Sequence, residues 1–543
     1  MDNWQGLSCV VLLNVLYTNH PDKIIGMFED YCQVPIFSLK SKLLTSKYVT
    51  SKYTLVALSH GCVVLIIPVN IQPSLPKQCI YIYYTYLCIL HTQSYTTINS
   101  LPNMEEQNQP LSSRISTVVP ATPRDEENDT CHLSCTDMMM KLHYIKAIYF
   151  FTSEAAQGFL SAHELKKPMF PLLDLYTKIS GRIRRSESGR PFIKCNDAGV
   201  RIVESHFDMT LKEWLRQNGF GVEGVVHDHV LGPDLGFSPL VFVKFTWFKC
   251  GGLCVGLSWS HILGDAFSAF NFIIMWSKAL SGHVPPKSLH VPNSIKPSPS
   301  SNYTIYMKKV TVIEEQWLAT SDTKVVTQSF YVTSKQLEHL VKATSNENNK
   351  VSCFEVLSAL LWKYIANIRQ GSETKVVTIC THGNGRRENE FPSNNSLVLS
   401  IVEANVEVEK SDIQDLVRLI GEKKIVGNYH LMEKLEEENG WKEDFVVYGA
   451  NLTFVDLEQA NIYGVKLNGQ KPIVANCAFH GVGDKGVVLV LPTSQEDNED
   501  ESKRRMITVS LPEKELDQLK DKLEEEWGIT SYMQLFDDDQ KHN

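Results

Sequence analysis

The most constraining feature of this sequence is the block of residues 241–280, in which two strand-like runs lead directly into a helix-like run. The runs Val241–Phe248 and Leu253–Ser260 are rich in β-branched and aromatic residues, and only the segment KCGG separates them. Such a short connection favours an antiparallel hairpin. Beyond Asp265, apolar residues recur at near-helical spacing up to Gly282, which predicts a helix. The chain is therefore predicted to turn from a sheet into a helix at residue 261.

His261 occupies this junction, four positions before Asp265. Histidine has the side-chain pKa closest to neutrality, so an accessible imidazole can take a proton from an alcohol or amine as it attacks an acyl carbon. We interpret His261 as a candidate general base and Asp265 as an anchor of the bend. The same spacing recurs at His480 and Asp484, and about one such match is expected by chance among seventeen histidines. We interpret the second pair as a coincidence.

Other classes of active site have weaker support in the sequence. The segment GLSWS could place Ser258 as a nucleophile, but Ser260 replaces the second glycine that the strained elbow requires. There is no P-loop, dinucleotide fingerprint or H-E-x-x-H motif. The segments CHLSC and CGGLC lack the paired spacing of a zinc site, so we expect no bound metal. The thirteen cysteines without a regular framework indicate reduced thiols in the cytosol.

The first 103 residues differ in composition from the rest of the chain. About 10% of them are charged, against about 24% of residues 104–543. The apolar run at residues 53–72 is interrupted by His60, Pro68 and Asn70 and has no flanking basic cluster, so it is a poor candidate for a membrane span. We interpret residues 1–103 as an atypical extension, and as an over-extended gene model rather than functional protein.

The remaining 440 residues are predicted to form two α+β domains, because strands and helices mix without strict βαβ alternation. The predicted boundaries are 104–282 for the first domain, 283–325 for a Pro- and Ser-rich crossover, and 326–543 for the second. Around residues 196–199 we expect a turn between two short strands. Leu516, Leu519 and Leu523 predict a last helix, with a capping box from Ser510 to Glu513. The net charge of -9 argues against nucleic-acid binding.

The order of these landmarks resembles the plant BAHD acyltransferases. The segments STVVPATP, SGRIRRSESGRPFIKCNDAGVRIVES, LCVGLSWSHILGDAFSAFNFI, FEVLSALLWKYIA and GNGRR follow one another as in that family. The resemblance implies two similar chloramphenicol-acetyltransferase-like domains joined by a crossover loop. It also implies a channel between the domains, which acyl-CoA and an acceptor enter from opposite faces. The expected protein is a monomer with no permanently bound cofactor and with acyl-CoA as co-substrate or ligand.

The resemblance also implies roles for single residues. His261 corresponds to the family's general base, and Gly264 to the small residue that precedes the motif's aspartate. Asp265 is expected to point away from the channel and to form an ion pair with Arg386 of GNGRR. The implied reaction removes a proton from the acceptor, forms a tetrahedral intermediate at the thioester carbon, and releases CoA.

The chain departs from the family at one signature. Where the motif DFGWG is expected, residues 466–470 read KLNGQ. The Eceriferum/Glossy group of wax proteins resembles this chain in two respects: it lacks the DFGWG motif, and it retains the histidine motif. That group implies an accessory role: promoting very-long-chain acyl elongation for cuticular wax, with a membrane-bound condensing enzyme, at the cytosolic face of the endoplasmic reticulum. The alternative is an ordinary acyl-CoA-dependent O- or N-acyltransferase, so whether the chain is an enzyme stays open at this point.

Overall fold

The computed structural model divides the chain into two compact units, Met1–Glu106 and Gln107–Asn543. The first unit contains an antiparallel sheet of three described strands, β1 (Val11–Leu13), β2 (Tyr53–Ala57) and β3 (Val64–Pro68). In the second unit the structure describes residues 112–124, 129–291, 307–311, 316–319, 323–344, 351–370, 372–383, 389–422, 424–425, 444–494 and 504–530. The interpretation of residues 1–103 as a gene-model artefact stays a prediction.

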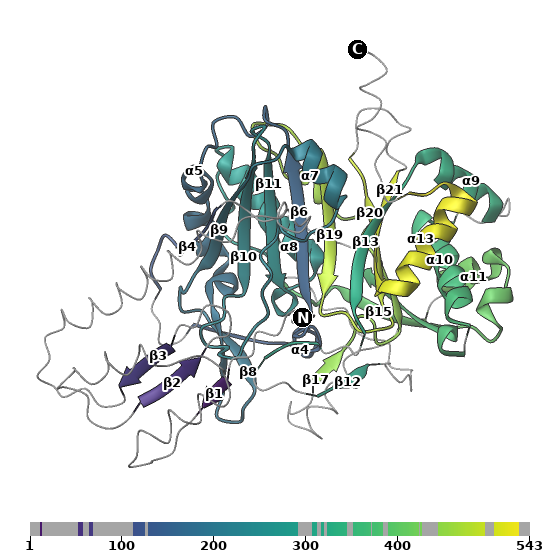
Figure 1. Ribbon diagram of the computed structural model, residues 1–543, viewed down its shortest axis with the longest axis horizontal. Coiled ribbons are helices and arrows are strands. Elements are labelled where there is room, and N and C mark those ends of the chain that lie inside the picture. Colours follow the sequence, from purple (N-terminus) through teal and green to yellow (C-terminus); the bar gives the residue numbers. More distant parts are fainter. Residues whose placement is uncertain are drawn as a thin grey trace, which may run out of the picture. The chain divides into compact units, whose positions relative to one another are not determined.

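A six-stranded sheet carries the predicted hairpin. Its order is β19-β6-β11-β10-β9-β4, with bounds β4 (Ser112–Val118), β6 (Tyr144–Phe151), β9 (Val200–Phe207), β10 (Val241–Phe248), β11 (Leu253–Ser260) and β19 (Val474–His480). Strands β10 and β11 pair antiparallel, with Val241 opposite Trp259, which confirms the hairpin. Strand β19 comes from the second half of the chain and pairs with β6, so residues far apart in sequence complete one sheet (Figure 1).

A seven-stranded sheet forms most of the second half. Its order is β13-β21-β20-β18-β14-β15-β16, with bounds β13 (Val325–Val332), β14 (Val376–His382), β15 (Leu397–Glu403), β16 (Lys424–Ile425), β18 (Leu452–Asp456), β20 (Val487–Pro492) and β21 (Arg505–Pro512). The described helices of the second half are α9 (Ser334–Thr344), α10 (Cys353–Arg369), α11 (Ile413–Gly421) and α13 (Glu513–Trp527). Figure 1 shows these helices together beside the sheet, and their apolar side chains share one core cluster with it.

Two smaller sheets complete the described strands. One has the order β5-β8-β7 and the other pairs two short strands, with bounds β5 (Thr130–His132), β7 (Arg182–Arg185), β8 (Pro191–Lys194), β12 (Lys308–Val310) and β17 (Asp444–Val446). The strands expected on either side of residues 196–199 are β8 and β9, but they lie in different sheets. The intervening turn, with positive φ at Asp197 and Gly199, therefore carries the chain from one sheet to the next and does not close a hairpin.

The helices of the first half position the predicted site. Those that the structure describes are α4 (Cys135–Met139), α5 (Ala162–Lys166), α6 (Met169–Leu175), α7 (Leu211–Asn218) and α8 (Ala266–Leu280). The described 3-10 turns are η3 (Thr177–Ser180), η4 (His261–Leu263), η5 (Ser372–Lys375), η6 (Val408–Lys410) and η7 (Ile462–Gly464). Helix α8 is buried over most of its length and begins directly after the hairpin, as predicted. Within the residues that the structure describes, every helix is too short or too polar to cross a membrane.

The last helix is predicted correctly, but its cap is not. Leu516, Leu519 and Leu523 are buried on one face of α13, as their spacing predicts. The N-cap residue is Pro512, and no side chain caps the helix. Ser510 still lies within β21, where its hydroxyl is 2.7 Å from that of Thr327 on the neighbouring strand. The cross-strand bond thus uses the hydroxyl that the capping box would need.

Candidate functional site

The candidate site begins where β11 ends. His261 is the first residue of the turn η4, and its backbone amide donates to the carbonyl of His143 at 3.0 Å. The amide of Asp265 donates to the carbonyl of Ser393, on the segment that precedes β15, at 3.3 Å. Backbone bonds to two distant segments therefore fix both ends of the turn that presents the imidazole.

Asp265 caps the helix that follows. Its Oδ1 atom accepts from the backbone amide and the hydroxyl of Ser268, both at 2.8 Å, which satisfies an otherwise unpaired amide in the first turn of α8. Its Oδ2 atom lies 2.9 Å from Nδ1 of His382, at the end of β14. The His382 ring also stacks on Phe267 with 4.3 Å between centroids. These bonds direct the carboxylate into the start of α8 and toward β14.

The predicted ion pair with Arg386 involves a residue outside the described part of the chain, so it stays a prediction. The partner that sequence reasoning missed is His382. The only signal for it was its place at the end of a buried strand, four residues before Arg386.

Residue 264 must be a glycine because two backbone segments approach each other closely at this position. A Cβ atom at this position would lie 2.6 Å from the backbone nitrogen of Ser393 and 2.9 Å from the side chain of Ser268. Real Cβ atoms do not come so close to a backbone atom, so a larger residue would push the turn away from Ser393. The glycine thus allows the turn that follows His261 to dock against the second half of the chain.

The His261 imidazole is fully buried and bonded to a phenol. Its Nε2 atom lies 3.0 Å from the hydroxyl of Tyr448, which is itself fully buried. Phe479 meets the imidazole edge-on, with 5.7 Å between centroids. Burial is the largest effect on the ring, and it lowers the pKa of His261, because the charged form loses its hydration. The imidazole is therefore neutral, the protonation state that a base needs.

A small cavity lies beside Tyr448, the phenol partner of His261. A cavity of ≈ 10 Å³ lies against Tyr448 and Phe479, and its other lining residues include Asp265, Phe267, Cys380 and His382. This volume is about the minimum for one water molecule. The His261 side chain does not line this cavity and is itself fully buried, so an acyl thioester could reach the imidazole only if covering side chains moved.

A second buried histidine holds the backbone at Tyr448. The Nε2 atom of His143 accepts from the amide of Val447 at 3.1 Å and lies 3.4 Å from the amide of Tyr448. The two rings are 4.8 Å apart. Complete burial lowers the pKa of His143 to about 3, so its ring is neutral and free to accept. His143 thereby positions the loop that brings the phenol to His261.

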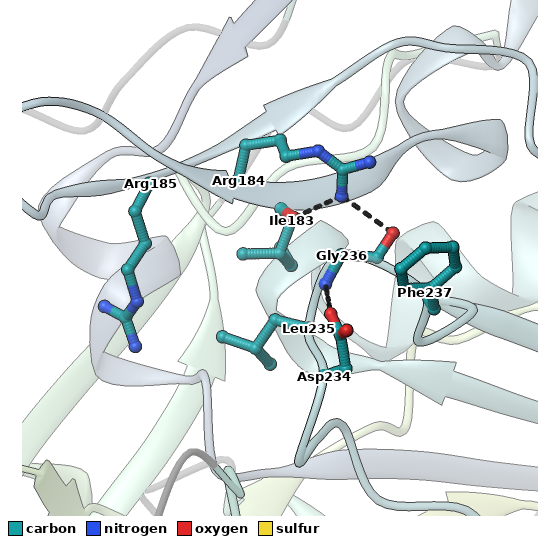
Figure 2. A pocket seen from close by; sticks show the side chains of 7 residues that line it. All are labelled: Ile183, Arg184, Arg185, Asp234, Leu235, Gly236 and Phe237. Atoms are coloured by element: carbon teal, nitrogen blue, oxygen red, sulfur yellow. Dashed lines mark hydrogen bonds between the residues drawn. The ribbon is translucent and has the colours of Figure 1, made fainter. Parts of the chain in front are cut away.

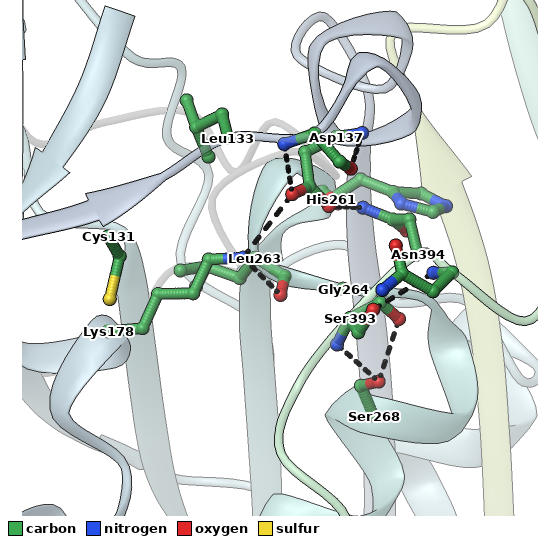
Figure 3. Close-up of polar contacts among 12 residues, drawn as sticks. Cys131, Leu133, Asp137, Lys178, His261, Leu263, Gly264, Ser268, Ser393 and Asn394 are labelled. Carbon is green, nitrogen blue, oxygen red and sulfur yellow. Dashed lines mark hydrogen bonds and ion pairs between the residues drawn. The ribbon is translucent and has the colours of Figure 1, made fainter. Parts of the chain in front are cut away.

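A buried polar cluster supports the turn from the other side (Figure 3). Asn394 donates from Nδ2 to the carbonyl of His261 and to Oδ1 of Asp137, each at 2.9 Å. Lys178 donates from Nζ to the carbonyl of Leu263 at 3.2 Å and lies 3.7 Å from Oδ2 of Asp137. Lys178 and Asp137 are each 5% exposed, so their charges are buried as a pair. These residues fix the carbonyls of the turn.

Sequence reasoning did not single out Lys178, Asp137 or Asn394. Asp137 had one available signal, the pattern Ser134-x-x-Asp137 of a capping box, which the structure forms at the start of α4. Lys178 and Asn394 come from a 3-10 turn and an irregular segment, where no periodicity marks a buried position.

The second H-x-x-x-D pair has a different setting. His480 ends β19, and burial lowers its pKa to about 4. Asp484 lies beyond a turn, with a carboxylate oxygen 2.9 Å from Nζ of Lys308. The contacts of His480 and Asp484 therefore differ from those of His261 and Asp265. In addition, the described residues contain no group of three or more His, Cys, Asp or Glu side chains that could hold a metal ion.

The chain is similar to known proteins over most of its length. Residues 112–526 match the Transferase family, and this span includes every residue of the site described above. Protein ECERIFERUM 2 of Arabidopsis thaliana is 38% identical over 433 residues, which cover 77% of this chain and 99% of that protein. The chain belongs to the BAHD transferase family. A further relative of this BAHD chain, Protein ECERIFERUM 26 of Arabidopsis thaliana, is 35% identical over 75% of the chain and 94% of that protein.

Solved structures confirm the fold expected of a BAHD chain. Vinorine synthase aligns with a TM-score of 0.54 at 17% identity, over 76% of this chain and 96% of that one. TRI101 of F. sporotrichioides, complexed with coenzyme A and T-2, aligns with a TM-score of 0.53 at 16% identity, over 74% and 98%. The two-domain, chloramphenicol-acetyltransferase-like α+β fold is thus confirmed.

Residues 466–470, where the BAHD signature is expected, form a tight turn. Leu467 and Gln470 exchange backbone hydrogen bonds at 2.9 and 3.0 Å around Asn468 and Gly469, both of which have positive φ. This is the type I′ turn that Asn-Gly favours. The Asn468 side chain donates to the carbonyl of Gln157 at 2.8 Å. The departure from the family motif therefore has its own well-bonded structure.

A larger cavity of this BAHD chain lies away from His261. It measures ≈ 390 Å³ and is lined by Ile183, Arg184, Arg185 and residues 234–237. Figure 2 shows the guanidinium of Arg184 donating to the carbonyls of Ile183 and Gly236, at 3.0 and 2.7 Å. None of the predicted site residues lines this cavity, so its greater volume does not make it the candidate site.

Proposed function

We propose that this chain is an accessory factor of very-long-chain acyl elongation for cuticular wax, and that it uses the BAHD fold to bind acyl-CoA. The proposed partner is a membrane-bound condensing enzyme at the cytosolic face of the endoplasmic reticulum. Relatives named ECERIFERUM, similar over nearly their whole length, support this assignment. The proposal that the chain binds acyl-CoA is supported by the fold that it shares with TRI101, which was crystallised with coenzyme A.

One observation carries the accessory role over group transfer: the bond between His261 and Tyr448. If Nε2 is unprotonated, the phenol donates to it and occupies its lone pair. If Nε2 is protonated, it donates to the phenol and cannot act as a base. In either tautomer Nε2 is not free to take a proton from an acceptor while the two atoms are 3.0 Å apart. The His261 side chain is also fully buried, so a thioester could reach it only if covering side chains moved.

The loss of the second family signature supports the same conclusion. Residues 466–470 form a bonded Asn-Gly turn in place of the aspartate and aromatic residues of the motif. An efficient acyltransferase would need both an accessible base and a channel wall that positions the substrates. A binding role needs neither of them at His261.

The test is co-expression with a condensing enzyme in cells that normally make shorter acyl chains. We expect that cells with both proteins accumulate longer acyl chains than cells with the condensing enzyme alone. Cells with this chain alone serve as the control and should keep their normal profile. An unchanged profile in the doubly expressing cells, with both proteins present by immunoblot, would contradict the proposal.

A second measurement separates the accessory role from the alternative. The purified chain is incubated with a very-long-chain acyl-CoA and a fatty alcohol or phenolic acceptor, and free CoA is measured. The proposal predicts no release above the rate of uncatalysed hydrolysis. Acceptor-dependent release would identify the chain as an ordinary acyltransferase.

A further inference from the structure

Two free thiols, those of Cys131 and Cys195, lie close together in the first half of the chain. Cys131 is on β5 opposite Ile193, and the amide of Cys195 donates to the carbonyl of Asp129 at 3.0 Å. Cys131 and Cys195 are therefore diagonal neighbours on adjoining antiparallel segments. Their Sγ atoms are 3.5 Å apart, and both residues are free cysteines. A disulfide has an S–S distance of about 2.05 Å, so it would form with a movement of about 1.5 Å.

The two thiols differ in reactivity. A hydrogen bond from Cys195 is the largest influence on Cys131, and Lys178 and Arg124 add positive charge, so the pKa of Cys131 is lowered to about 7 despite burial. The same pairing and burial raise the pKa of Cys195. Cys131 is partly exposed, whereas Cys195 is 1% exposed. Cys131 is therefore the nucleophile of the pair, and Cys195 is the resolving thiol.

We propose that Cys131 and Cys195 form a reversible disulfide that responds to oxidised low-molecular-weight thiols such as glutathione disulfide. The Cys131 thiolate attacks one sulfur of glutathione disulfide and releases a glutathione thiolate. Cys195 then attacks the mixed disulfide at Cys131, releases the second glutathione, and gives up its proton. In total, two protein thiols are oxidised and one glutathione disulfide is reduced to two glutathiones.

The disulfide is coupled to the site through Lys178. Figure 3 draws Cys131 beside the Lys178 side chain, which interacts electrostatically with its thiolate. Lys178 also donates to the carbonyl of Leu263, in the turn that begins with His261. Oxidation removes the negative charge of the Cys131 thiolate, with which Lys178 interacts. It also shifts β5, which leads into the helix that carries Asp137. Both changes loosen the support of the turn.

The first test maps the disulfide in the full-length protein. Reduced protein is exposed to glutathione disulfide at pH 7, blocked with N-ethylmaleimide and digested with trypsin. Cys195 is the only cysteine of the tryptic peptide 195–201, and Cys131 shares the peptide 125–141 with Cys135. We expect these peptides to become linked in the wild type and in Cys135→Ser, and to separate after reduction. A Cys195 that stays fully alkylated, while the exposed Cys250 is glutathionylated, would overturn the proposal.

Two substitutions of Cys195 distinguish the effect of its hydrogen bond on Cys131 from its role in forming the disulfide. Cys195→Ala removes the donor, and alkylation of Cys131 at pH 7 should slow about five- to tenfold as its thiolate fraction falls. Cys195→Ser keeps a donor, so Cys131 should stay reactive but should stop at the mixed disulfide with glutathione. Equal rates in all three proteins would contradict the assignment of Cys131 as the activated thiol.

The coupling is tested by hydrogen exchange. Peptides that cover residues 261–265 should exchange faster in the oxidised than in the reduced wild-type protein, and equally in Cys131→Ser under both conditions. If the disulfide forms and these peptides do not change, the link through Lys178 is wrong. The measurement does not depend on the elongation role, so its failure and that of the proposed function are distinguishable.

Discussion

The Nε2 atom of His261 and the hydroxyl of Tyr448 lie 3.0 Å apart, with both side chains fully buried. The two residues are 187 positions apart in sequence. Their bond places a phenol where an acceptor hydroxyl would have to stand for His261 to act as a base. The well-kept histidine motif is thus compatible with a function other than group transfer.

Replacing Tyr448 with Phe should destabilise the protein by about 1–3 kcal/mol, because the substitution leaves a buried imidazole nitrogen without its partner. Urea denaturation of both proteins measures the difference. His261→Gln is the matched variant, since its amide can still reach the phenol, and it should cost less. Equal stability of Tyr448→Phe and the wild type would show that the bond is not formed in solution.

Acidification should destabilise the protein through its neutral buried histidines. The folded pKa of His143 is about 3, below the unfolded value of about 6.5. The contribution of neutral His143 to the free energy of unfolding is therefore complete above pH 6.5 and is lost as the pH falls toward 3. Between pH 7.5 and pH 5, His143 alone should reduce the free energy of unfolding by about 2 kcal/mol. His143→Gln, whose amide oxygen can still accept from Val447, should show a smaller loss in urea titrations at the two pH values.

The helix cap at Asp265 should matter more than its charge. Asp265→Ala removes the acceptor of two bonds from Ser268 and one contact with His382, and should cost about 2–4 kcal/mol. Asp265→Asn keeps an oxygen for the cap and should cost about half as much. Thermal or chemical unfolding of the pair measures this order. A larger loss for Asn than for Ala would contradict the capping role.

Gly264→Ala should destabilise the protein by about 1–3 kcal/mol, because its Cβ would lie 2.6 Å from a backbone nitrogen. The control is Gly421→Ala at the end of α11, where the nearest atom is a Glu355 carboxylate oxygen at 3.6 Å. There the gain in helix propensity should leave the protein unchanged or slightly more stable. Comparable losses for the two variants would mean that close packing at Ser393 is not the cause.

Local patterns predict the part of the site that is made from consecutive residues. The alternating apolar runs, the short KCGG connection and the helical spacing after Asp265 place His261 correctly at the end of β11. Each of these signals comes from hydrogen bonds and packing between residues near one another in sequence.

Contacts between distant segments could not be predicted in this way. Tyr448, His382 and Asn394 reach the turn from the second half of the chain. Nothing in the local sequence marks Tyr448 or Asn394, and the place of His382 at the end of a buried strand does not show that it contacts Asp265. The same limit explains the one error named in the fold, the helix cap at Ser510. The sequence does not show that Thr327 lies opposite Ser510 on the neighbouring strand. The turn around residues 196–199 is predicted correctly, but the sequence does not show that β8 and β9 on either side of it belong to different sheets.

The most direct measurement of the central claim compares the wild type with His261→Gln in cells that co-express a condensing enzyme. An accessory factor that binds acyl-CoA without using His261 as a base should lengthen the acyl chains to the same extent in both cases. The account predicts overlapping chain-length profiles at matched protein levels. Lengthening by the wild type alone, with His261→Gln folded and present in equal amount, would contradict it.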